Sequence, residues 1–188
     1  TTAKSRMNGD FKRDFIQLLR DRGFIASDNA RLVPLPGGVS SEIYLVEEDV
    51  QRFVVKRALA KLKVNPEWHA DTSRNLSEQA YMRFVKAFRP DAVPNIYRSD
   101  DEAGLFSMEY LENFRNWKQD LLERECDPEL ARRAGALLGE IHGRSWSDRR
   151  VMKQFDSIPT FDQLRIDPYL RATAAKHPKL QGVLLAEA

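Results

Sequence analysis

Residues 35–59 read LPGGVSSEIYLVEEDVQRFVVKRAL, and they contain the clearest strand and turn signals of the chain. The runs Ser41–Glu47 and Gln51–Arg57 are rich in strand-forming residues, and Glu48-Asp49 between them is a turn, so the stretch predicts a β-hairpin. The pair Gly37-Gly38 precedes this hairpin. Because glycine has no Cβ, the pair fits either a tight turn with positive φ or a loop whose backbone N–H groups converge on a phosphate. Taken alone, these residues favour the turn.

The composition indicates a folded globular protein of one or two domains. The chain has 188 residues, of which 42% are hydrophobic and 10% aromatic. Its 30 basic and 28 acidic residues are interspersed and leave a formal net charge of +2, so we expect no nucleic-acid partner. Without a long apolar run or a signal-type segment, we expect no membrane partner and a cytoplasmic location. The single Cys126 cannot form an internal disulfide, and the three dispersed histidines have no metal-site spacing.

Outward from the hairpin, the pattern predicts α+β architecture with segregated parts. Helical spacing is found before and after the hairpin, and the long segment from Trp117 onward is helical almost throughout. We expect a five-stranded antiparallel sheet with one inserted helix, then a connector and a helical region in which Trp117 and Trp146 are core anchors. The expected elements are a helix over 11–19 stopped by Gly23, strands over 31–35, 41–47, 51–57, 95–99 and 105–111, and helices over 75–88, 130–141 and 161–176.

Lys56 is a cation inside the apolar strand Phe53-Val54-Val55-Lys56. Alternation places it on the face of Val54, opposite Phe53 and Val55. A partly buried ammonium needs a partner because desolvating it alone is costly. A lysine on an edge strand that reaches water explains the pattern equally well.

Glu78 is a candidate partner for that lysine. It shares a helical stripe with Tyr81, Val85 and Phe88, at the edge of a face expected to meet the sheet. However, Asn75-Leu76-Ser77-Glu78 also has capping-box spacing, in which Glu78 folds back on the start of its own helix. From this residue alone the cap is the preferred interpretation.

A fourth candidate element is the apolar run over residues 106–111, which leads into the connector. Its end can present backbone N–H and C=O groups to a planar base, with Met108 as the apolar neighbour. A plain core strand is the alternative.

In this order, the four elements resemble the nucleotide-binding lobe of the protein-kinase-like fold. The amino-acid sequence of these elements is similar to that of the aminoglycoside phosphotransferase family, which also includes choline kinase-like and methylthioribose kinase-like enzymes. The resemblance covers nearly the whole chain. It is carried by LPGGVSSEIYLV (35–46), FVVKRAL (53–59), SEQAYMRFV (77–85), VPNIYRSDDEAGLFSMEYL (93–111), ARRAGALLGEIHGRSW (131–146) and FDQLRIDPYL (161–170).

The resemblance implies an ATP- or GTP-dependent phosphotransferase that uses Mg²⁺ and acts on an unknown small-molecule hydroxyl. Lys56 would hold the α- and β-phosphates, and Glu78 would orient Lys56. The phosphate-side loop would be Gly37, Gly38, Val39, Ser40 and Ser41, and adenine would lie against Met108, Glu109, Tyr110 and Leu111. The implied division is a nucleotide-binding lobe over 1–111, a hinge over 112–116 and an incomplete helical lobe over 117–188.

The sequence also departs from the family pattern. The family places its catalytic aspartate in a His-Gly-Asp run followed by an asparagine, whereas His142-Gly143 here precedes Arg144. We interpret this run as the end of the long helix, with Gly143 just beyond it. No catalytic or metal-binding residue of the pattern is found before Ala188, so we expect a truncated, inactive portion of the enzyme.

Two rival hypotheses remain open at this stage. One is a nucleotide-binding or scaffold module of the same fold without catalysis. The other is an α+β interaction domain that binds no nucleotide. The sequence predicts no oligomeric state.

Overall fold

The structure is a computed structural model, and it describes residues 2–36, 39–64 and 67–188, with side chains from residue 12 onward. The chain forms two compact units. One comprises Thr1–Gln79, Pro94–Tyr110 and Ser157–Ala188, and the other comprises Ala80–Val93 and Leu111–Asp156. The predicted division into a nucleotide-binding lobe that ends at residue 111 and a helical lobe that begins at residue 117 stays a prediction.

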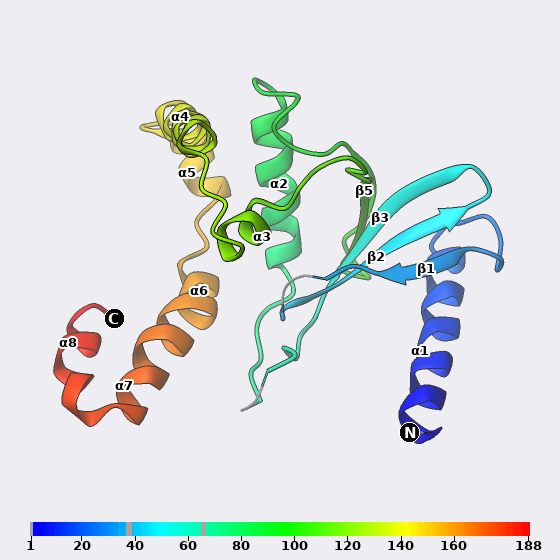
Figure 1. Cartoon of the computed structure of the whole chain (residues 1–188), viewed down its shortest axis with the longest axis horizontal. Coiled ribbons are helices and arrows are strands. Elements are labelled where there is room, and N and C mark those ends of the chain that lie inside the picture. Colours follow the sequence, from blue (N-terminus) through cyan, green and yellow to red (C-terminus); the bar gives the residue numbers. More distant parts are fainter. Residues whose placement is uncertain (1, 37–38, 65–66) are drawn as a thin grey trace. The chain divides into compact units, whose positions relative to one another are not determined.

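The first unit is built on a five-stranded antiparallel sheet with strand order β1-β2-β3-β5-β4 (Figure 1). The strands are β1 (Arg31–Pro34), β2 (Ser41–Glu48), β3 (Gln51–Ala58), β4 (Ile96–Asp100) and β5 (Leu105–Glu109). The predicted hairpin is confirmed, and its turn residue Asp49 has a φ of 51°, a value that Asp tolerates better than most residues. This antiparallel sheet with segregated helices confirms the predicted α+β class.

One face of the sheet packs against α1 (Thr2–Asp21) and the turn that follows it. Phe15 and Leu19 are one helical turn apart and are fully buried, and the rings of Phe15 and Tyr44 lie 5.3 Å apart. Gly23 ends the helix at a φ of 68°, which glycine adopts without strain. The core on this face also contains Phe24, Ile25, Leu32, Val46, Phe53, Val55 and Leu105.

The opposite face carries Leu45, Val54 and Phe106, all buried, and it also carries Lys56. On the central strand β3, Lys56 lies between Ile43 of β2 and Phe106 of β5. The alternation predicted for β3 is therefore confirmed, and the lysine is on a central strand and not at an edge.

The remaining helices of the first unit are short and follow one another. They are α6 (Ile158–Phe161), the π-helical η1 (Asp162–Arg171), α7 (Ala172–Lys176), the 3₁₀ turn η2 (Pro178–Leu180) and α8 (Gln181–Ala186). The predicted helix over 161–176 is confirmed, but its hydrogen bonding is wider than that of an α-helix. Pro168 lies inside η1 and has no N–H to donate, a common cause of such local changes in helical pitch.

The inserted helix α2 (Arg74–Lys86) begins in the first unit, and its later turns belong to the second. In that second unit, Phe84 packs edge-on against Phe88 and Phe155, and Arg89 pairs with Glu140 at 2.6 Å. Its own helices are α3 (Trp117–Leu122), α4 (Pro128–Ser145) and α5 (Arg149–Gln154), with the side chains of Asn116, Asp127 and Asp148 as N-caps.

Two predictions about this helical unit are wrong. Gly143 does not follow α4 but lies inside it, since the helix continues to Ser145, and Arg144 stacks on the ring of Phe88 at 4.4 Å. Trp146, which caps this helix, is 83% exposed and is not a core anchor, and Trp117 is also exposed. Among the described residues, no helix is long and apolar enough to span a membrane.

Candidate functional site

The ammonium of Lys56 donates to both carboxylate oxygens of Glu78, at 2.5 and 2.6 Å. The Lys56 side chain is 15% exposed and that of Glu78 is 33% exposed, so the pair lies partly out of water. Because each oxygen accepts one bond, the lysine is held in a fixed direction, and its third N–H points away from the carboxylate. The sheet thus presents the oriented ammonium of Lys56 beside the start of α2.

Glu78 does not cap its own helix, so the capping-box interpretation is wrong. The helix begins at Arg74, which places Asn75 in its first turn and not before it. The Asn75 side chain donates instead to the carbonyl of Gly104, at 2.8 Å. Of the two roles that the sequence allows for Glu78, partner of Lys56 or cap of its own helix, the structure shows the first.

The first turns of α2 are fastened to the β4–β5 hairpin by buried amides, and this fixes the direction of Glu78. Asn75 and Gln79 are four residues apart and both are buried, and Gln79 accepts a bond from the Ser99 hydroxyl at 2.5 Å. Together with Glu78 they form one helix face, since positions i, i+3 and i+4 lie together. Tyr81, predicted for the same stripe as Glu78, is exposed.

Arg74 is a structural residue that sequence reasoning missed. Its guanidinium donates to the carbonyls of Leu59 at 2.7 Å and Ala70 at 3.3 Å, and also to those of Ser40 and Asp71. Burial lowers the pKa of this guanidinium, and the negative charges of Asp71 and Glu78 oppose that shift. Arg74 thereby ties the start of β2, the end of β3 and the start of α2 to one another.

The candidate phosphate-side loop is described only in part. Gly37 and Gly38 lie outside the described residues. The carbonyl of Val39 accepts from the Lys63 N–H at 2.8 Å, and that of Ser40 accepts from the Leu59 N–H at 3.0 Å. Ser41 is buried in β2, opposite Ala58. The carbonyls of Val39 and Ser40 are thus bonded to the chain that follows β3.

The candidate adenine segment continues β5. Met108 lies in the sheet between Val54 and Ile96. Glu109 is held by Asn95, which accepts from its N–H at 2.8 Å and donates to its carboxylate at 2.7 and 3.1 Å. The ring of Tyr110 lies under the guanidinium of Arg52, with 4.9 Å to the ring centroid. Leu111 is exposed and is the first residue of its stretch in the second unit.

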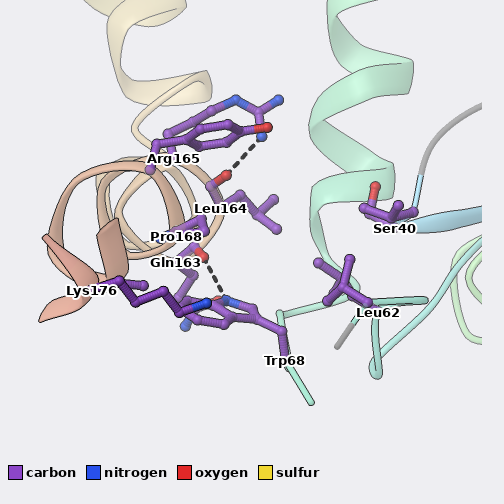
Figure 2. A pocket seen from close by; sticks show the side chains of 12 residues that line it. Ser40, Leu62, Trp68, Gln163, Leu164, Arg165, Pro168 and Lys176 are labelled. Carbon is purple, nitrogen blue, oxygen red and sulfur yellow. Dashed lines mark hydrogen bonds between the residues drawn. The ribbon is translucent and has the colours of Figure 1, made fainter. Parts of the chain in front are cut away.

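A pocket of about 260 Å³ opens beside Ser40, between the segment that follows β3 and the helices η1 and α7 (Figure 2). Its wall is mainly apolar, and the Trp68 indole N–H donates to the carbonyl of Gln163 at 2.9 Å across it. Arg165 and Lys176 are its charged lining residues, and both are cations. Other residues of the lining are Ser40, Leu62, Leu164 and Pro168.

A metal centre is not formed by the part of the chain that the structure describes, in which no three His, Cys, Asp or Glu side chains gather closely enough to hold an ion. His142, which the sequence places in a catalytic-loop-like run, lies in the last turns of α4. The site assembled here is therefore a cation held by a carboxylate, and the described residues do not fit a resident metal.

Comparison with known proteins shows the family of the chain. The sequence pattern of the phosphotransferase enzyme family matches residues 31–188. The methylthioribose kinase of Bacillus cereus (strain G9842) is 23% identical over 128 residues, which cover 67% of this chain and 33% of that protein. The methylthioribose kinase of Geobacillus thermodenitrificans (strain NG80-2) is 26% identical over 106 residues, covering 55% of this chain and 27% of that protein.

The chain belongs to the phosphotransferase enzyme family, since the match includes most of its residues. It spans about a third of the length of the relatives that it matches.

Proposed function

We propose that this chain carries the nucleotide-binding part of a small-molecule kinase, which transfers a phosphoryl group from ATP or GTP to a hydroxyl. The observation that carries the proposal is the Lys56–Glu78 pair on the central strand, with both carboxylate oxygens on the ammonium. Phosphoryl transfer asks a protein chiefly to place its reactants and to neutralise charge, and an oriented lysine does both for a polyphosphate.

In this proposal Lys56 binds the α- and β-phosphates, and Glu78 sets the direction of its ammonium. Val39, Ser40 and Ser41, with Gly37 and Gly38, form the phosphate-side loop, and Arg74 supports that loop through the Ser40 carbonyl. Adenine lies against the backbone of Glu109, Tyr110 and Leu111, beside Met108. Because the Glu109 N–H is already bonded to Asn95, we assign the adenine-facing N–H groups to Tyr110 and Leu111.

Mg²⁺, when bound to the nucleotide, supplies further neutralisation of the phosphate charge. Because His142-Gly143 is followed by Arg144 and not by an aspartate, we propose that the catalytic carboxylate and the metal ligands of the family pattern are absent from this portion. On that proposal, this portion alone binds nucleotide and does not complete the transfer. The acceptor proposed is a small molecule with a hydroxyl group, and the names of the relatives make methylthioribose the first compound to test.

The test is calorimetric titration of the chain with ATP. We expect Lys56→Ala to weaken ATP binding by about tenfold or more, a loss of about 1.4 kcal/mol. Lys61→Ala is the matched control, because Lys61 follows the same strand but lies exposed and pairs with Glu67. Unchanged ATP affinity in Lys56→Ala would contradict the proposed site, and equal losses in both variants would indicate a general charge effect.

A further inference from the structure

A second cavity, of about 410 Å³, opens on the α1 side of the sheet, on the opposite face from Lys56. It is bounded by the end of the α1 turn and by strands β3, β4 and β5. Its lining includes Phe24, Arg52, Phe53, Tyr97, Arg98 and Ser107. Its size falls within the range of small-molecule pockets, whose walls are mostly apolar with a few polar groups that fix orientation.

A β-bulge places two consecutive residues along this cavity, and both side chains also remain exposed to solvent. Ile96 pairs with Met108 and Arg98 pairs with Ser107, so Tyr97 is an extra residue in β4. In a regular strand, Tyr97 and Arg98 would point to opposite faces, whereas a bulge turns neighbouring side chains toward one face. Both residues line the cavity, together with the directly opposed Ser107.

Ser107 supplies a polar group that forms no hydrogen bond with the described residues. Its residue is 3% exposed, it lines the cavity, and its hydroxyl has no hydrogen-bond partner in the described residues. The hydroxyl oxygen is not among the fully buried polar atoms that lack a partner, so it opens onto the cavity and can form its hydrogen bond there. A ligand in the cavity would satisfy it.

Arg98 supplies a positioned cation. Its guanidinium lies over the Phe24 ring, 5.5 Å from the centroid. It also lies against Gly23, where a Cβ would come within 3.3 Å of a guanidinium nitrogen. In the described ranges no carboxylate forms a direct ion pair with Arg98, although the charge of Asp100, which pairs with Arg22, acts on it from nearby. None of the six lining residues named above is acidic. Arg52, the second cation, pairs with Glu47 at 3.4 Å.

We propose that this cavity binds a small organic anion, with a carboxylate or phosphate on Arg98 and Ser107 and an apolar or aromatic body against Phe24, Phe53 and Tyr97. Charge-assisted bonds from a guanidinium to such an anion are stronger than neutral ones, so the negative group sets the specificity. The site is independent of the proposed nucleotide site, since it uses none of the same residues.

The test is NMR titration of the ¹⁵N-labelled chain with benzoate as the probe and benzamide as its neutral counterpart. We expect benzoate to shift the amide signals of residues 51–53, 97–98 and 107, with a Kd of about 1 mM, and benzamide to bind about tenfold more weakly. Arg98→Gln should weaken benzoate binding by about tenfold, and Ser107→Ala by about threefold.

Two control variants show whether benzoate binding depends on this cavity or on the overall charge of the protein. Arg132→Gln removes an exposed arginine of α4 and should leave benzoate binding unchanged. Lys56→Ala should also leave it unchanged, even where it abolishes ATP binding. The inference is overturned if benzoate shifts no signals of the cavity, if benzamide binds equally well, or if folded Arg98→Gln protein binds benzoate as tightly as the unaltered chain.

Discussion

Glu78 holds Lys56 through both carboxylate oxygens, at 2.5 and 2.6 Å, across 22 residues of sequence. Two buried amides of the same helix face, Asn75 and Gln79, fasten the carboxylate-bearing turn to the β4–β5 hairpin. The direction of the lysine is therefore set by contacts that no nucleotide has to make. Such preorganisation is what a phosphate-binding site needs.

Replacing Glu78 tests whether this orientation matters. We expect Glu78→Gln to weaken ATP binding by about threefold to tenfold, because Lys56 keeps its charge but loses its fixed direction. Glu67→Gln is the control, since Glu67 pairs with the exposed Lys61. Titration calorimetry measures both, and an ATP affinity in Glu78→Gln equal to that of the control would show that the pair does not position the lysine for a nucleotide.

Arg74 is expected to matter for stability. Arg74→Met removes the donor to four backbone carbonyls. That of Ser40 keeps the Leu59 N–H, but those of Leu59 and Ala70 are left partly buried without this donor, which should lower the free energy of unfolding by about 2–4 kcal/mol. Arg132→Met, which breaks an exposed pair with Glu129, should cost about 0.5 kcal/mol or less. Urea unfolding compares the two variants, and similar losses would mean that Arg74 does not tie these three segments together.

Two glycines with open space around them should respond to alanine with opposite signs. Gly104 has a φ of 62°, so Gly104→Ala should lower the free energy of unfolding by about 1 kcal/mol through backbone strain. Gly135 lies inside α4, where Ala is the better helix former, and Gly135→Ala should raise it by about 0.5–1 kcal/mol. Amide hydrogen exchange in the β4–β5 hairpin and in α4 measures the change in local stability that each variant causes. Changes of the same sign in both variants would contradict these backbone assignments.

Asp100 should contribute to the loss of stability in acid. The Ala103 N–H is the main cause that lowers the pKa of Asp100 in the folded chain, and Arg22 adds to it. A carboxyl whose pKa is lower when folded stabilises the protein above its unfolded pKa of about 3.9, and this stabilisation is lost as the pH falls through the folded pKa. Thermal unfolding between pH 6 and 2 should therefore show a smaller acid-induced fall in Tm for Asp100→Asn. An identical fall in both proteins would contradict this role.

Local periodicity predicted much of the fold. The hairpin over residues 41–58, the stop at Gly23 and the five strands all follow from short-range patterns of apolar and turn residues. Gly143 shows the limit of such signals, because a glycine near the end of a helical stripe predicts a helix end, whereas α4 continues through Gly143 to Ser145. Tertiary packing, here Arg144 on Phe88, can outweigh the small helix penalty of one glycine.

The candidate site was only half predictable. The sequence indicates Lys56 and Glu78 as candidates, but it does not decide between their pairing and a helix cap, because it does not show that the helix begins at Arg74. Arg74 was missed because an arginine in a polar segment usually indicates a solvated surface, and its carbonyl partners are distant in sequence. Arg98 was missed because the bulge at Tyr97 breaks the alternation from which strand faces are inferred. Ser107 lies in the regularly paired β5, but a single serine in an apolar strand gives no sign of a cavity.

Binding of the phosphates by Lys56 is tested by comparing the affinities of ATP and adenosine for the unaltered chain and for Lys56→Ala. If Lys56 binds the phosphates, the variant should bind ATP about tenfold more weakly or worse and bind adenosine with unchanged affinity. Equal affinity of both proteins for ATP, or an equal loss for ATP and adenosine, would contradict the assignment of Lys56 and Glu78 as the phosphate site.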